Sequence, residues 1–268
     1  MTLPPRPRVI AVANQKGGVG KTTTAINLST ALAATGHATL LVDLDPQGNA
    51  STGLGIDPAA RRLTTYDVMT RTASLAESVH ATEVPELTLA PATMDLLSID
   101  IELSAASDRA LRLRQAIAAY GAEPAAPDYV VVDCPPSLTM LTVNALAAAH
   151  AVLAPLQCEF FAMEGLSQLL TTIAEVRAGV NPDLVIHGIV LTMVDARNNL
   201  SNQVEADVRS TMGELVYDTV IPRNVRLSEA PSHGKPALLY DLKCAGSQAY
   251  LRLVSELMDR EHRMLGAA

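Results

Sequence analysis

The sequence predicts an α/β fold: a doubly wound, mostly parallel sheet flanked by helices, built as a single domain over residues 1–268. Short apolar runs alternate along the chain with segments of helical apolar spacing, and no internal repeat is present. A glycine-rich loop stands between the first apolar run and the first helical segment, the context that a phosphate-binding loop requires. With 49 % hydrophobic residues in a chain of 268, one large aliphatic core is expected.

Composition narrows the class of protein further. The chain holds 28 acidic residues against 20 Lys and Arg, a formal net charge of −8, which argues against coating nucleic acid with the whole surface. No apolar run approaches the length of a membrane span, and the N-terminus does not resemble a signal peptide. Three cysteines, far apart and without C-x-x-C spacing, indicate reduced thiols rather than a zinc site. We expect a cytoplasmic protein whose residues 1–7, rich in proline, form a short extended leader.

The glycine loop follows an expected strand at 9–13 and precedes an expected helix at 23–34. Its glycines can turn successive N–H groups inward to form a concave anion site, to which the N-terminus of the next helix adds its positive dipole end. We expect Lys21 to reach the β- and γ-phosphates of ATP, and the Thr22 hydroxyl to bind Mg²⁺. The candidate nucleotide-binding residues of the loop are Gly17, Gly18, Val19, Gly20, Lys21, Thr22 and Thr23.

Carboxylates end two more of the expected strands. The run 39–42 is followed by Asp43 and Asp45, and the apolar run 129–132 is followed by Asp133. Ligands of open parallel sheets bind at the carboxyl ends of the strands. An apolar strand that ends in Asp is the pattern of a strand whose carboxylate holds the Mg²⁺ shell of a nucleotide, so Asp133 is the second candidate metal residue. For Asp43 and Asp45 a solvated turn is the alternative.

The remaining elements follow from the same periodicities. Gly36 is placed to end the first helix, and Cys134-Pro135-Pro136-Ser137 separates a strand from the next helix. Further strands are expected at 87–90, 151–155, 187–192 and 216–221. Further helices are expected at 66–71, 95–106, 108–120, 138–149, 163–178, 203–212 and 246–265.

The loop departs from the usual G-x-x-x-x-G-K-[ST] pattern, because Gln15 stands where Gly is expected and a second lysine, Lys16, follows it. This is the deviant form of the Walker A motif, and the chain resembles the deviant Walker A ATPases of the P-loop NTPase fold. The resemblance covers nearly the whole chain and is strongest to the partition ATPases of the ParA/Soj type. Beyond the loop, the stretches that carry it are 41–49 (LVDLDPQGN), 133–137 (DCPPS), 159–165 (EFFAMEG) and 221–232 (IPRNVRLSEAPS).

The resemblance implies roles for particular residues. Lys16 would reach across a dimer interface to the nucleotide of the partner, and Asp45 would position the water that attacks ATP. With Lys21 these two form the expected catalytic set, while Asp43 would orient its neighbours. Pro222 and Asn224 lie where the family packs the adenine.

The resemblance also implies partners. The chain begins almost directly on its first strand, so we expect no N-terminal helix-turn-helix and no reading of an operator sequence. The implied cycle is ATP-dependent homodimerisation, non-specific DNA binding on the nucleoid, and slow hydrolysis that a ParB/Spo0J-like protein stimulates. Basic residues on the dimer would contact DNA: Arg197 and Arg226, with Arg223, Lys235 and Lys243 as weaker candidates, and a solvated surface charge as the alternative for each.

Other members of the wider family remain alternatives. A MinD-like membrane-associated ATPase of division-site placement would need a basic amphipathic helix at the C-terminus, where this chain has mixed charge. An electron carrier like nitrogenase iron protein would need ligand cysteines at positions other than Cys134 and Cys158. A metabolic ATP-dependent ligase would leave the stretch 221–232 unexplained.

Overall fold

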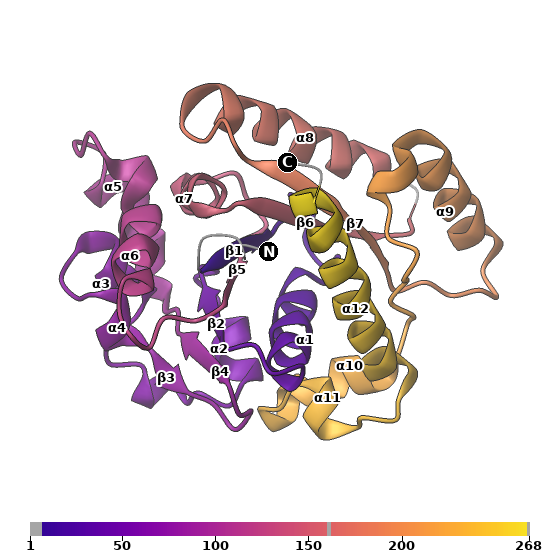
Figure 1. The fold of residues 1–268 in the computed structure, drawn as a ribbon, viewed down its shortest axis with the longest axis horizontal. Helices are drawn as coiled ribbons and strands as arrows, with labels where there is room; N and C mark the ends of the chain where they lie inside the picture. The colour runs from indigo at the N-terminus through magenta and orange to yellow at the C-terminus, as the bar shows by residue number, and fades with distance from the viewer. Residues whose placement is uncertain (1–6, 160–161, 267–268) are drawn as a thin grey trace.

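The computed structural model describes residues 7–159 and 162–266; the expected leader, apart from Pro7, and Phe160 and Phe161 of the 159–165 stretch lie outside the described residues. A seven-stranded sheet in the order β3-β4-β2-β5-β1-β6-β7 forms the centre of the molecule (Figure 1). All neighbouring strands are parallel except β3, which runs antiparallel to β4. The predicted fold class is confirmed. The strands are β1 (Arg8–Val12), β2 (Thr39–Asp43), β3 (His80–Ala81), β4 (Leu87–Ala90), β5 (Tyr129–Asp133), β6 (Ala151–Gln157) and β7 (Val185–Thr192).

Helices cover both faces of the sheet, and the strands therefore bury both of their faces. In β1, Val9 and Ala11 join one apolar cluster, whereas Ile10 and Val12 join the other. The helices of the first cluster are α3 (Thr65–Thr70), α5 (Ile99–Glu102), α6 (Arg112–Gly121), α7 (Met140–Ala148), α8 (Ala162–Gly179) and α9 (Asn199–Met212). The helices of the second cluster are α1 (Lys21–Ala34), α2 (Asn49–Gly53), α10 (Val225–Glu229), α11 (Ala237–Tyr240) and α12 (Ala245–Gly266). Helix α4 (Leu75–Ser78) contributes Leu75 to the first cluster and leads into β3.

The helices expected at 95–106 and 108–120 are shorter and less regular than predicted. The first is a 3₁₀ turn at 94–98 followed by the single turn of α5, because Ser98 and Ser104 donate to the carbonyl oxygens of Asp95 and Ile101 and so compete with the helical ladder. The second begins as a 3₁₀ turn at 109–111, and α6 starts only at Arg112. Here the buried Asn144 of α7 replaces helical partners by accepting from the Leu113 N–H and donating to the Arg109 carbonyl.

The strand expected at 216–221 is also wrong. This segment runs beside β7 but makes only isolated bridges, Ile189 to Val216 and Val194 to Pro222. The N–H groups of Tyr217 and Ile221 donate to carbonyls of β7, whereas those of Asp218 and Thr219 donate to the Glu256 side chain of α12. The prediction failed because apolar residues indicate burial but do not say which partners the backbone finds.

A buried carboxylate holds the turn after β2. Both oxygens of Asp43 accept hydrogen bonds: Oδ1 from the Asp45 N–H at 3.1 Å, and Oδ2 from the Ser51 N–H and hydroxyl at 2.9 and 2.7 Å. Burial raises the pKa of Asp43 to about 6, even though these hydrogen bonds lower it. Because this value exceeds that of an unfolded Asp, about 3.9, the group stabilises the fold most at low pH. That contribution is lost as pH rises through about 6.

This geometry predicts a pH-dependent effect of Ser51→Ala. At about pH 7.5, where Asp43 is ionised, the change should destabilise the ligand-free protein by about 1.5–3 kcal/mol, because a hydrogen bond to a buried charge is lost. At about pH 5, where the carboxyl is mostly protonated, the loss should fall to about 0.5–1.5 kcal/mol. Urea unfolding at both pH values measures the difference.

Thr65→Val is the matched control, since the Thr65 hydroxyl donates to the backbone carbonyl of Asp43, which does not titrate. Its loss should be the same at both pH values. Equal losses for Ser51→Ala at the two pH values would contradict the role assigned to the ionised carboxylate.

Candidate functional site

The predicted loop and the acidic residues meet at the carboxyl edge of the sheet. The strands β2, β5 and β1 are neighbours, with Asp43 in register with Asp133 and Asp133 in register with Val12. The glycine loop leaves β1 at this edge and enters α1 at Lys21. Residues separated by more than a hundred positions in the sequence are thus brought to one site.

The loop has the backbone of an anion nest. Gly18 and Gly20 have φ of +76° and +88°, a region that L side chains rarely adopt. A Cβ built on Gly17 or Gly18 would meet no atom of the described chain within 4 Å, so the front of the loop is open. The first turn of α1 holds no acidic residue, which leaves the positive end of its dipole available to an anion.

Lys21 is a buried cation in this nest. Only 6 % of it is exposed, and its Nζ donates to the Lys16 carbonyl at 2.8 Å. Burial lowers the pKa of Lys21, while the nearby Asp133, Cys134 and Asp45 raise it. A bound phosphate would supply the anionic partner that this buried ammonium group lacks.

Asp133 is fully buried, and neither of its oxygens has a hydrogen-bond partner among the described residues. Burial and the neighbouring Asp43 raise its pKa well above the ordinary value; the Thr22 hydroxyl is close enough to lower it somewhat, without a hydrogen bond of normal geometry. A buried carboxylate without partners is unfavourable unless a cation neutralises it. Mg²⁺ prefers oxygen ligands and is usually held by one or two protein groups together with substrate phosphates, which fits Asp133 and Thr22.

Asp45 lies at the open side of this cluster. It is 9 % exposed, and its Oδ1 accepts a hydrogen bond from the Gln47 N–H at 3.0 Å. The other oxygen is not used in that contact. Asp43, by contrast, has both oxygens occupied by Ser51 and Asp45 and does not face the loop as a free ligand.

The two deviant positions of the loop contact α8 and the segment before it. Gln15 donates to the Thr172 hydroxyl at 2.7 Å and to the Gln168 carbonyl at 3.2 Å. Lys16 is 32 % exposed and forms an ion pair with Glu159 at 3.0 Å. Sequence reasoning missed these contacts, although the 159–165 stretch that carries part of the family resemblance includes Glu159.

A pocket of about 270 Å³ adjoins the loop. Pro222 and Asn224, the residues expected at the adenine, line it together with Gly20 and Thr23. The Asn224 side chain caps α10 by accepting from the Arg226 N–H. Among the lining residues that were missed are Thr192, Met193 and Tyr250, because nothing in their local sequence indicates a pocket. Two of them touch the phosphate region: Thr192 donates to the Val19 carbonyl, and the Tyr250 hydroxyl shares a hydrogen bond with Thr24.

The two arginines expected to contact DNA lie on segments that the Val194–Pro222 bridge holds side by side. The Arg197 side chain is 91 % exposed and pairs with Asp195. Arg226 is half exposed and pairs with Glu229 and Asp241. Of the weaker candidates, Lys235 pairs with Glu83 and Arg223 lines the pocket. No helix in the described part of the chain is long and apolar enough to cross a membrane.

Comparisons with known proteins show what this chain is similar to. A family model described as an AAA domain matches residues 7–186. The chain is 61 % identical to the chromosome partitioning protein ParA of Caulobacter vibrioides, over 95 % of both chains. It is 50 % identical to the sporulation initiation inhibitor protein Soj of Bacillus subtilis, over 93 % of this chain and 98 % of that one.

Solved structures share the fold. The cobyrinic acid a,c-diamide synthase of Mycobacterium smegmatis, with bound ADP and magnesium, superposes with a TM-score of 0.82 at 38 % identity over 94 % of both chains. The cell division ATPase MinD of Pyrococcus furiosus gives 0.77 at 24 % identity over 94 % of this chain and 98 % of that one, a likeness of fold. The deviant loop and the sequence identity along almost the entire chain place this protein in the ParA/Soj family of chromosome-partitioning ATPases.

Proposed function

We propose that this protein is an ATP-dependent switch in DNA partitioning, which binds ATP and Mg²⁺, dimerises around the nucleotides and then binds DNA without sequence preference. The observation that supports it most is the buried Asp133, whose carboxylate oxygens have no hydrogen-bond partner among the described residues, close to Thr22 and to the buried ammonium group of Lys21 at the glycine nest. These groups match a Mg²⁺–polyphosphate. The Caulobacter relative at 61 % identity is closer in sequence than the Mycobacterium diamide synthase at 38 %, which favours partitioning over a ligase reaction.

Within one subunit, the loop residues Gly17 to Thr23 would bind the phosphates through backbone N–H groups, and Lys21 would neutralise the β- and γ-phosphates. Thr22 and Asp133 would hold Mg²⁺, which when bound neutralises charge that develops on the phosphates. Asp45 would accept a hydrogen bond from the attacking water and so orient it. The pocket lined by Pro222 and Asn224 would take the adenine.

Dimerisation depends on Lys16. In the structure its ammonium group pairs with Glu159 of the same chain, and a partly exposed ion pair contributes only about 0–1 kcal/mol. Lys16 can therefore exchange this carboxylate for the phosphates of a partner subunit at little cost. In such a dimer Lys16 would complete the active site of the partner, and hydrolysis would stay slow until a ParB-like protein engages the dimer.

DNA binding would follow from the same step. A monomer offers Arg197, Arg226 and their neighbours against a net charge of −8. A dimer presents twice as many arginines to the DNA phosphates, and affinity for DNA rises steeply with the number of phosphates neutralised at low salt. The surface ion pairs of both arginines are weak enough to be exchanged for phosphates.

Lys16→Ala should leave the binding of Mg·ATP to the monomer unchanged within about twofold, because the proposed target of this lysine is the partner's nucleotide. The variant should remain monomeric with ATP in analytical ultracentrifugation, under conditions in which the parent dimerises. Lys21→Ala is the contrasting variant, since it should lose ATP binding itself in a calorimetric titration. A Lys16→Ala protein that dimerises with ATP as the parent does would remove Lys16 from this role.

Arg197→Glu and Arg226→Glu should each weaken DNA binding on all sequences alike, while ATP binding and dimerisation persist. The slope of log affinity against log salt should become shallower by about one for each phosphate that the variant no longer neutralises. Arg177→Glu, an exposed reversal near the end of α8, changes the net charge equally and is the control. Fluorescence anisotropy with ATP, ADP and no nucleotide tests the proposal, which fails if DNA affinity is indifferent to nucleotide or if both reversals bind like the parent.

A further inference from the structure

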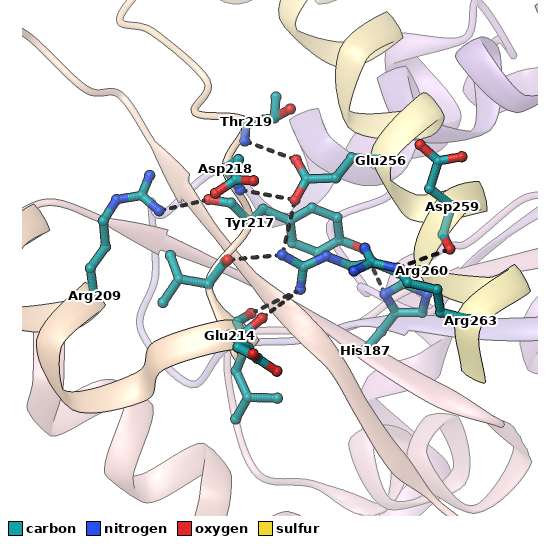
Figure 2. A network of polar contacts seen from close by, with 12 residues as sticks. His187, Arg209, Glu214, Tyr217, Asp218, Thr219, Glu256, Asp259, Arg260 and Arg263 are labelled. Carbon is teal, nitrogen blue, oxygen red and sulfur yellow. Dashed lines mark hydrogen bonds and ion pairs between the residues drawn. The ribbon is translucent and has the colours of Figure 1, made fainter. Parts of the chain in front are cut away.

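The segment 214–219 meets β7 through the Tyr217 N–H, which donates to the Ile189 carbonyl at 2.9 Å, and side chains hold several of its other backbone groups. Figure 2 shows Glu256 of α12 facing two successive backbone N–H groups, those of Asp218 and Thr219, each at 2.9 Å from one of its carboxylate oxygens. Arg260, one turn further along α12, donates to the carbonyls of Glu214 and Val216 at 3.0 and 2.9 Å and to Glu256 itself at 2.9 Å. The two side chains thus supply partners for backbone groups of the segment in addition to the one that β7 supplies.

Tyr217, in the middle of this segment, is fixed from three sides. The Arg260 guanidinium lies 4.0 Å from the centroid of its ring, a cation–π contact. Its hydroxyl shares a hydrogen bond with the buried His187 of β7. Its ring packs on Gly188, where an added Cβ would come within 2.6 Å of a ring carbon. The ring is fully buried, and these contacts hold the backbone of the segment with it.

The same segment continues into the pocket beside the glycine loop. Two residues after Thr219, the Ile221 N–H donates to the Leu191 carbonyl at 2.8 Å, and the Arg223 N–H donates to the Val194 carbonyl at 3.0 Å. Pro222 and Asn224 then line the pocket. Tyr250, at the other end of α12, lines the same pocket. Helix α12 therefore contributes Tyr250 to the lining of the pocket. The same helix carries the two side chains that hold the segment leading to Pro222 and Asn224.

We propose that Glu256 and Arg260 are positioning residues for the nucleoside part of the nucleotide. They hold segment 214–219 in the position from which Pro222 and Asn224 line the base site. Neither side chain touches the nucleotide itself. The inference rests on the proposed function, because it takes the pocket of about 270 Å³ as the base site. Binding of the phosphates, which the glycine loop performs on β1 and α1, does not depend on this segment.

The test compares a ligand that has a base with one that lacks it. Arg260→Met and Glu256→Gln, both close in size to the parent side chains, are titrated calorimetrically with Mg·ADP and with Mg·pyrophosphate, the latter also by competition against Mg·ADP. We expect Mg·ADP to bind about five- to twentyfold more weakly in both variants, because each removes hydrogen bonds that hold the backbone of the segment in place. Affinity for Mg·pyrophosphate should stay within about twofold of the parent.

Arg263→Met is the matched control, since the hydrogen bond that Arg263 makes to the described residues is from its Nε to the Asp259 carbonyl within its own helix, and the variant should bind both ligands like the parent. Far-UV circular dichroism and thermal unfolding show whether each variant is folded, and Arg260→Lys offers a milder change if Arg260→Met is not. Unchanged Mg·ADP affinity in folded variants would overturn the inference. An equal loss for Mg·ADP and Mg·pyrophosphate would overturn it too, since a general structural role would then suffice. A parent that does not bind Mg·ADP would refute the proposed function instead, and the pocket assignment with it.

Discussion

The carboxyl edge of the sheet depends on how three charged groups are accommodated inside an apolar core. Asp43, Asp133 and Lys21 are all buried where β2, β5 and β1 end. Asp43 is fully hydrogen-bonded and holds the turn after β2, whereas Asp133 has no hydrogen-bond partner among the described residues. A buried charge without partners costs several kcal/mol even after relaxation. Within this cluster the cost falls on Asp133, which lies near the Thr22 hydroxyl and the Lys21 ammonium group. A bound Mg²⁺–phosphate would offset it.

The deviant loop is fastened to the rest of the molecule by residues at and beside position 15, where the ordinary motif has its first glycine. Gln15 joins the loop to α8 through Thr172 and Gln168, and α8 approaches so closely that a Cβ on Gly165 would lie 3.5 Å from Lys16 and Asn14. Asn14 in turn donates to the Pro155 carbonyl at the end of β6 and accepts from the Lys16 N–H. A movement of Lys16 toward another subunit would therefore be transmitted to α8 through short contacts. The proposed dimerisation step would thus affect α8, which packs on one face of the sheet.

Periodicity in the sequence predicted what depends on local pattern. The bounds of β4 and β5 agree with the expected runs, and Gly36 has the positive φ, +88°, that ends α1. Prediction from periodicity failed where side chains distant in the sequence take over backbone hydrogen bonds. Asn144 does so at the start of α6, and Glu256 does so at 218–219. The residues of the candidate phosphate site could be proposed from the sequence because the chemistry of phosphate binding constrains their spacing. Glu159, Met193 and Tyr250 were not, because their relation to the site exists only after folding.

The C-terminal helix joins the two ends of the candidate nucleotide site. Near its start, Tyr250 contacts Thr24, one residue after the last loop residue expected to bind phosphate. Two and three turns later, Glu256 and Arg260 hold the segment that leads to Pro222. Figure 1 shows α12 lying along α1, the helix that follows the glycine loop. Helix α12 therefore contacts both α1 and the segment that leads to Pro222. If the pocket takes the base, as proposed, α12 contributes to both parts of the site: it packs on the helix that follows the glycine loop, and it holds the segment that leads to Pro222.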